Sequence, residues 1–221
     1  MSTTASFPGS PRVAKGAIIT LESNDPVPKV ILFQYNPESL TRTVRAQTSE
    51  GSSGERSEPF RLNGPPAETI SVEIELDATD QLEHPDQNQN SATMGISPQL
   101  AALELILYPK SSQVILNNIL SLTGELEILP PEGPFTIFSF GPKRMVPVRL
   151  TAFQITEEFY DVNLNPIRAK VSLEMRILSS TDLPSSHPGY SLFLSHQIIK
   201  ETMGALATAR GLSAAGISGG I

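Results

Sequence analysis

Acidic side chains and one histidine gather in the polar stretch between residues 77 and 90. Oxygen and nitrogen ligands for a metal ion could come from five of them, namely Asp77, Asp80, Glu83, His84 and Asp86. A calcium loop, however, spaces its ligands regularly and places a glycine at its sharp turn. Neither feature occurs in this stretch, so the sequence favours a solvated acidic loop over residues 80–90. We expect no metal and no other cofactor.

The adjacent pair Glu157 and Glu158 could act as an acid and a base. Neighbouring residues in a strand point to opposite faces, so at most one of the two could serve a given site. The phosphate-loop motif Gly-x-x-x-x-Gly-Lys and the zinc motif His-Glu-x-x-His are absent from the sequence. We therefore expect no enzyme, no catalytic residue and no cofactor-binding residue.

The three histidines are scattered along the chain. His84 lies in the acidic loop, His187 in a predicted linker and His196 in a predicted helix. A lone histidine in a linker is most often solvated, and no regular spacing joins these three to a ligand set.

Composition limits the classes of partner. The 221 residues include 16 basic and 23 acidic side chains, so the formal charge is -7, which gives no footprint for nucleic acid or an anionic membrane. Cysteine is absent, which excludes disulfides and thiolate metal sites. No segment approaches the ~20 apolar residues of a membrane span, and the first residues lack a signal pattern. The protein is expected to be cytoplasmic unless a machine carries it out.

The elements that position these residues are mainly strands. From Ile167 to Ile177, apolar residues fall on every second position with polar residues between them, which predicts a two-faced strand. An upstream strand changes its alternation phase, which predicts a bulge near Ala152 and Phe153. Residues 161–166 carry Asp, Asn and Pro and suit a turn. These segments together predict a long antiparallel hairpin.

Further strands are expected at residues 13–21, 30–35, 40–46, 69–77 and 135–141, with the second and third of these forming a hairpin. Ser97 to Leu107 follows helical spacing, with Ser97 as a cap and Pro98 in the first turn. Residues 112–122 fit either a helix or irregular structure. Residues 48–58 are rich in Ser, Gly and Glu and predict a loop.

The ends of the chain differ in composition from the middle. Residues 1–11 predict a flexible N-terminal arm, residues 12–183 a β domain, and residues 184–221 a linker followed by a helix over Tyr190 to Arg210 with a frayed end. A lone helix of this length is marginal in water, so it must pack against something. Two alternatives stay open: the helix folds back on the β domain, or it clamps a neighbouring protein.

Two separated blocks of sequence resemble one family. The first is Phe33-Gln-Tyr-Asn-Pro-Glu-Ser-Leu, and the second combines Val146-Pro-Val-Arg-Leu-Thr, Ile155-Thr-Glu-Glu-Phe and Leu164-Asn-Pro-Ile-Arg-Ala-Lys-Val-Ser-Leu. They resemble the N-terminal domain of tube-like baseplate proteins from contractile injection systems, which derive from phage tails. The resemblance spans residues 15–183. It departs at Phe140-Gly141, where the family often has Trp-Gly, and at the C-terminus, where no LysM module fits.

The resemblance implies a mainly β fold with α: a tube-like antiparallel β-barrel or two packed sheets, one packed helix and a C-terminal helix. It implies a structural tube-initiator subunit in a homohexameric ring between the spike and the inner tube, with other baseplate proteins as partners and no catalysis. The basic strand residues then line a lumen or an inter-subunit surface, whereas without the resemblance they are a solvated outer face; these residues are Arg42, Arg45, Arg149, Arg168, Lys170 and Arg176.

A ligand-binding β-barrel protein is the alternative from another class. Six or more alternating strands with one helix could enclose a pocket. An apolar pocket is usually lined by aromatic residues, but the chain has no Trp and four Tyr. This shortage favours the structural role.

Overall fold

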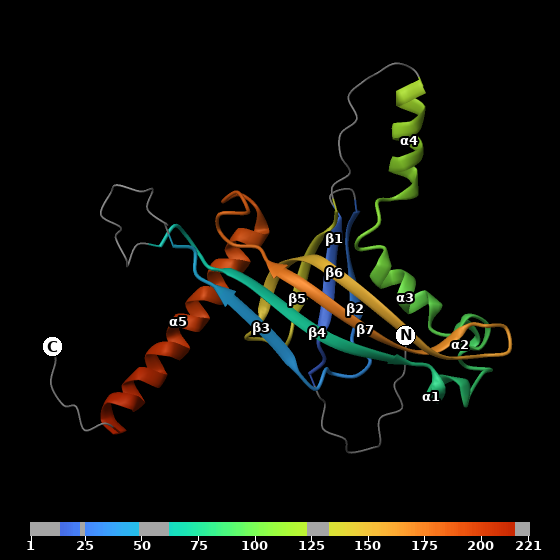
Figure 1. Ribbon diagram of the computed structural model, residues 1–221, viewed down its shortest axis with the longest axis horizontal. Helices are drawn as coiled ribbons and strands as arrows, with labels where there is room; N and C mark the ends of the chain where they lie inside the picture. Colours follow the sequence, from blue (N-terminus) through green and yellow to red (C-terminus); the bar gives the residue numbers. More distant parts are fainter. Residues whose placement is uncertain (1–13, 23–24, 49–61, 123–132, 215–221) are drawn as a thin grey trace.

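The computed structural model describes residues 14–22, 25–48, 62–122 and 133–214 (Figure 1). The predicted N-terminal arm, nearly all of the predicted 48–58 loop and the last residues of the predicted frayed end lie outside the described residues. The strands are β1 (Ala17–Glu22), β2 (Asp25–Leu32), β3 (Leu40–Arg45), β4 (Ala67–Asp77), β5 (Phe135–Ser139), β6 (Met145–Tyr160) and β7 (Pro166–Ile177). The helices are α1 (Thr79–Leu82), α2 (Gln89–Met94), α3 (Ser97–Glu104), α4 (Ser111–Leu122) and α5 (Pro188–Ala214).

The long hairpin formed by β6 and β7 is the centre of the sheet, as predicted. Its register breaks between Leu150 and Ala152, so a bulge lies beside the predicted position. The turn is organised by Asp161, whose Oδ1 accepts hydrogen bonds from the backbone N–H groups of Asn163 at 2.7 Å and Asn165 at 2.8 Å. Hydrogen bonds from the Asn165 side chain and backbone hold the pKa of Asp161 below its ordinary value.

The predicted strand at residues 69–77 is confirmed as β4, which pairs antiparallel with β7. Its buried residues alternate with outward-facing polar ones and are Ile70, Val72, Ile74 and Leu76. The buried row on β7 is Ala169, Val171, Leu173, Met175 and Ile177. Because side chains in a strand alternate between faces, the two rows form one apolar face.

The predicted hairpin between residues 30–35 and 40–46 is wrong. β2 pairs with β1, whereas β3 pairs with β4, so the two strands lie at opposite edges of the sheet. Asn36 supplies the reason, since its side chain accepts a hydrogen bond from the N–H of Gly16 and donates one to the carbonyl of Ala14. These bonds tie the turn to the start of β1, and the chain then crosses to the other edge.

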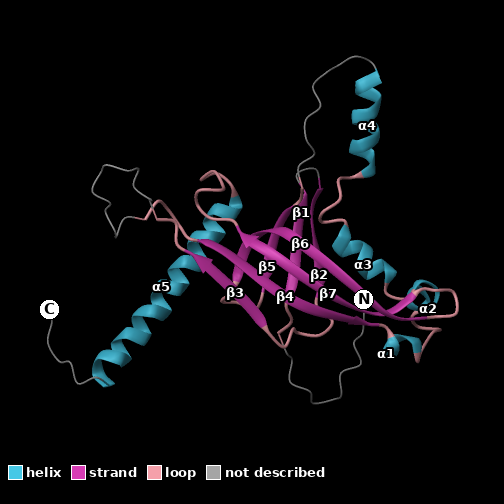
Figure 2. Cartoon of the chain, in the orientation of Figure 1, coloured by secondary structure: helices cyan, strands magenta, loops and turns pink. Residues whose placement is uncertain are grey.

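All seven strands form one antiparallel sheet in the order β2-β1-β5-β6-β7-β4-β3 (Figure 2). Among the described residues the two edge strands do not pair with each other, so a closed barrel is not confirmed, and neither is a pair of separate sheets. The sheet is strongly bent instead, and β1, β2 and β5 run behind β4, β6 and β7 in Figure 1. One core joins the two halves, including Ile18, Phe33 and Phe138 from one half and Ile70 and Leu173 from the other.

The predicted helix at Ser97 to Leu107 is confirmed as α3, although it ends at Glu104. Leu100 and Leu103 are buried in the shared core. Ser97 is not the cap, because the helix begins after Ile96 and no side chain caps it.

The remaining helices depart from expectation in different ways. The predicted acidic loop over residues 80–90 contains α1 and the start of α2. The ambiguous segment 112–122 is helical and belongs to α4, which projects from the body in Figure 1. The predicted C-terminal helix is confirmed as α5 and begins at Pro188.

Candidate assembly surfaces

Asp77, one of the acidic residues weighed as metal ligands, has a local structural role. Among the described residues, no group of three or more His, Cys, Asp or Glu side chains is placed to hold a metal ion. Asp77 accepts a hydrogen bond at 2.7 Å from the backbone N–H of Thr79, at the start of α1.

Glu157 and Glu158 lie on opposite faces of β6, as predicted from strand geometry. Glu158 lies 3.7 Å from Arg168 and 3.6 Å from Lys170 across the hairpin. Glu157 accepts a hydrogen bond at 3.2 Å from the hydroxyl of Tyr160. The two carboxyl groups therefore have separate partners and do not share a site.

The basic strand residues fall into two groups. Arg168 contacts Glu75, and Arg176 donates to Asp182 at 2.8 Å, so these residues form ion pairs on the polar face of the sheet. Arg42 differs because it lies opposite Ile70 in the pairing of β3 with β4. It is therefore on the same face of the sheet as the buried apolar residues. The sequence-based grouping of all six residues on one face is therefore wrong for Arg42.

Arg42 belongs to a charged cluster around the buried carboxylate of Glu68, which was not predicted from the sequence. Its Nε donates to Glu68 Oε1 at 2.7 Å, and Lys200 Nζ in α5 donates to Glu68 Oε2 at 2.9 Å. Glu68 is only 6% exposed. Burial pushes the pKa of Glu68 upward, but the hydrogen bonds from Lys200 and Arg42 outweigh it and hold the pKa below its ordinary value. The sequence did carry one sign of this burial, because Glu68 falls in the same alternation as the buried residues of β4.

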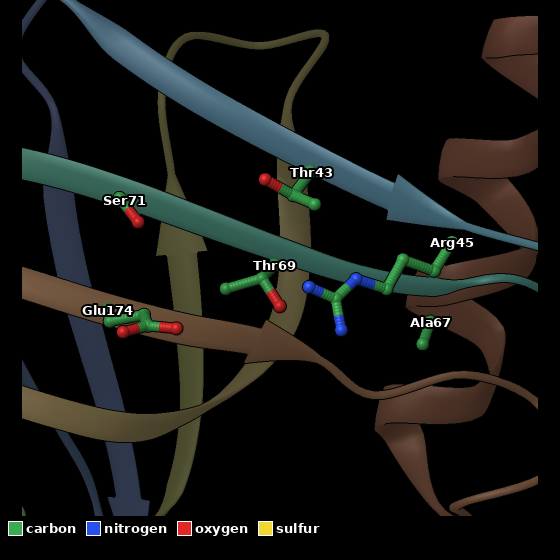
Figure 3. Close-up of a pocket in the computed structure, with 6 residues that line it drawn as sticks. All are labelled: Thr43, Arg45, Ala67, Thr69, Ser71 and Glu174. Carbon is green, nitrogen blue, oxygen red and sulfur yellow. The ribbon is translucent and has the colours of Figure 1, made fainter.

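A polar hollow of about 260 Å³ lies on the outer face where β3, β4 and β7 adjoin (Figure 3). Its lining is Thr43, Arg45, Ala67, Thr69, Ser71 and Glu174. Figure 3 shows the Arg45 side chain of β3 reaching toward Thr69 on β4, with Glu174 on the neighbouring strand β7. Such a surface is polar and open to solvent. It does not supply the enclosed apolar pocket that the ligand-binding barrel requires.

The β2 edge is partly blocked for pairing. The backbone N–H of Phe33 donates to the carbonyl of Gly16 on the β1 side at 2.9 Å. Since alternate N–H groups in a strand point the same way, those of Val30 and Leu32 point outward, and so do the nitrogens of Pro26 and Pro28. Proline has no N–H, so this edge lacks two donors and offers pairing mainly at its C-terminal end.

The β3 edge keeps all its donors and acceptors. It contains no proline, and every residue from Thr41 to Arg45 is exposed. Among the described residues, no strand pairs with its outer side. Charged residues on edge strands discourage uncontrolled pairing, and Arg42 and Arg45 supply that protection here. β3 is thus the more complete template for an added strand.

Exposed apolar side chains mark the tip of the β6–β7 hairpin and α4. At the tip, Val162 is 99% exposed and Leu164 is 79% exposed. Phe159 and Leu164 have positive φ angles of 53° and 64°, which residues other than glycine rarely adopt. On α4, half or more of each of four apolar side chains is exposed, namely Val114, Ile115, Leu116 and Ile119.

No helix in the described part of the chain is long and apolar enough to cross a membrane.

Comparison with known proteins finds distant neighbours. No family model matches the chain, and no curated protein matches it. One similar solved structure is the tail of an empty GTA particle with C6 symmetry, with 13% identity, a TM-score of 0.29, and coverage of 73% of this chain and 90% of that one. Another is the six-fold symmetrised baseplate of the anti-feeding prophage, with 15% identity and a TM-score of 0.26. This match covers 77% of this chain and 94% of that one. At these values, fold and role must be argued from the chain's own residues.

Proposed function

We propose that this chain is a structural subunit of a phage-tail-like contractile injection system. In this role it is a tube initiator that forms a homohexameric ring between the spike and the inner tube and is assembled into the injection particle. The proposal draws on the two sequence blocks that resemble tube-like baseplate proteins, at residues 33–40 and 146–173.

The observation that carries the proposal is the open sheet with two unequal edges. A cyclic ring needs a heterologous contact, in which two different surfaces of the same subunit meet. β2 and β3 provide two such surfaces at opposite ends of the strand order. If the C-terminal end of β2 pairs with β3 of the next copy, neither edge stays exposed. The polar face with Arg168 and Lys170 then faces either the lumen or a neighbouring ring.

This mechanism is templating and involves no reaction. The carboxylates of Glu157 and Glu158 are engaged with Tyr160, Arg168 and Lys170, which suits a structural role. In the same scheme, residues 12–183 form the ring domain, and residues 184–221 form a linker and helix that add contacts to the domain or to its neighbours.

A cysteine pair tests the ring contact directly. The chain has no native cysteine, so Val30→Cys on β2 and Thr43→Cys on β3 would be its only thiols. The two edges lie at opposite ends of one sheet, so a disulfide between them must join two copies. We expect oxidation of assembled particles to give a ladder of covalent oligomers that ends at six copies. Val30→Cys paired with Val114→Cys on α4 is the control and should give no ladder.

Deletion of the gene tests the role independently of the contact. Electron microscopy should then reveal no complete baseplates, and the native gene should restore them. Normal contracting particles from the deletion strain would rule out the proposed function. Normal particles that contain the cysteine pair but yield no covalent oligomers would refute the edge contact alone.

A further inference from the structure

The helix α5 has a docked half and a projecting half. Four residues spaced by four, three and four positions form one helical face toward the sheet, and they are Gly189, Phe193, His196 and Lys200. Phe193 packs against the core, His196 is buried, and Lys200 reaches Glu68. Every residue from Glu201 to Thr208 is exposed, and Figure 1 shows this half extending away from the sheet.

Close packing holds the beginning of the docked half. A Cβ atom on Gly189 would lie 2.7 Å from Leu183 Cδ1 and 2.8 Å from Phe135 Cε2, so a larger residue there would have to displace these side chains. The His187 ring meets Phe135 edge-on, with centroids 4.6 Å apart. The Nδ1 atom of His187 accepts a hydrogen bond at 3.0 Å from the backbone N–H of Gly189.

Ionisable groups hold the end of the docked half. His196 is 7% exposed, and the backbone of Lys143 in the β5–β6 turn favours a proton on its ring. Its Nδ1 atom is buried and has no hydrogen-bond partner. The charged groups around the ring are Lys200 on α5, Glu68 on β4 and Arg42 on β3. The docked face therefore buries one imidazole and one carboxylate beside two cations, Arg42 and Lys200, whose side chains are 32% and 37% exposed.

We propose that the docked half of α5 is an acid-released latch, which stays on the sheet while His196 is neutral and Glu68 is ionised. A proton on His196 would place a third positive charge beside Lys200 and Arg42, with a single carboxylate to balance them. A buried charge without its own partner is costly, so the helix leaves the sheet and the imidazolium becomes solvated. This device does not depend on the proposed ring.

The direction of the pH dependence follows from two groups. Burial lowers the pKa of His196 below its ordinary value of 6.5; Lys200 and Arg42 lower it further, and Glu68 and the Lys143 carbonyl oppose them. The docked state thus binds fewer protons than the released state. The contribution of His196 to docking is complete above pH 6.5 and is lost as the pH falls below that value. The pKa of Glu68 is held below its ordinary 4.5, so its contribution is lost only at lower pH. Release has two steps, and the His196 step comes first.

Hydrogen exchange on the full-length protein tests the latch. We expect protection of the amides in residues 189–200, corrected for intrinsic exchange rates, to fall by at least tenfold between about pH 7.5 and about pH 5. The amides of β7 in the same samples should keep their protection. If both segments lose protection together, or if neither does, the latch is wrong.

Two variants assign the first step to His196. His196→Gln keeps a polar N–H group and cannot be protonated, so we expect it to abolish the upper step and leave the lower one. His84→Gln is the matched control and should leave both steps unchanged. An upper step that persists in His196→Gln would overturn the proposal.

A measurement on the unmodified protein covers the case in which the variant folds poorly. The C2 proton of His196, followed by NMR, should titrate below its ordinary range together with the loss of α5 protection. Titration of His196 without any loss of protection would also refute the latch.

Discussion

The two faces of the β4–β7 pair show how differently this chain uses its side chains. On one face Val72 lies opposite Leu173, and both are buried. On the other face Glu73 lies opposite Ser172, and both are exposed. Burial of apolar area stabilises the first face strongly, whereas exposed ion pairs add little to the second. The outer face is therefore free to change for the sake of contacts, and the inner face is not.

The sharpest test of this difference places the same charge on adjacent residues of β7. Leu173→Asp buries an unpaired carboxylate among Val171, Met175 and Ile177, so we expect a loss of more than about 4 kcal/mol in the free energy of unfolding. Ser172→Asp should change it by less than about 0.5 kcal/mol, because the residue faces water. Thermal unfolding of both variants measures the effect. Similar melting of the two would mean that the faces are wrongly assigned.

A truncation after Leu183 asks how much of the inner face depends on α5. The docked half covers Phe135 and the Glu68 cluster, so we expect its removal to cost about 2 kcal/mol, or about 4–8 °C in melting temperature. Truncation after Glu201 removes only the exposed half and should leave melting unchanged. If the truncation after Leu183 also melts like the full chain, α5 does not contribute to the stability of the domain. The alternative that α5 clamps a neighbouring protein would then be favoured.

Carboxylates on the two faces offer a finer comparison. Glu68→Gln leaves Arg42 and Lys200 without their shared partner, and we expect a loss of about 1–3 kcal/mol in urea unfolding. Glu75→Gln removes the partner of Arg168 on the outer face and should cost about 0–1 kcal/mol, because that pair is solvated. Equal losses would contradict the distinction between the buried carboxylate of Glu68 and that of Glu75, which is 34% exposed.

The smallest expected effect is a gain at the hairpin tip, where both faces end. Leu164 has a φ of 64°, which asparagine tolerates better than leucine. Leu164→Asn should therefore stabilise the protein by up to about 1 kcal/mol. Val162→Asn removes a similar exposed apolar group without a positive φ and should give no gain. A loss of stability in Leu164→Asn would show that the leucine side chain contributes contacts of its own.

Alternation predicted the central strands well, because a half-buried strand must repeat every two residues. β4, β6 and β7 satisfy this condition, and so do the bulge and turn between Leu150 and Asn165. The same reasoning missed the start of β2, because Pro26 and Pro28 are poor strand residues except where their nitrogens face away from a partner. Residues at an edge obey weaker rules, so the sequence predicted them less well.

Long-range features could not be predicted from local patterns. The edge positions of β2 and β3 depend on the contacts of Asn36 with Ala14 and Gly16, which no periodicity reveals. The openness of the sheet is a property of all seven strands together. Docking of α5 uses His196 and Lys200 where apolar residues would normally mark a packed face. An ionisable residue on a helix looks solvated until its partner, here Glu68, is known.

The strand order also determines when the sheet can form during synthesis. The first four strands occupy the two flanks as separate hairpins, β1 with β2 and β3 with β4, and the middle of the sheet is supplied by β5, β6 and β7. Ile19 must wait for Ile137 and Val72 for Leu173, each about a hundred residues later in the chain. The inner edge of β1 stays unpaired until β5 is available, and that of β4 until β7 is available, which exposes both edges to aggregation. A chain released before Pro166 thus contains β5 and β6 for β1 but leaves the hairpin of β3 and β4 without its neighbour β7. A circular permutant that begins at β5 would make the middle of the sheet first.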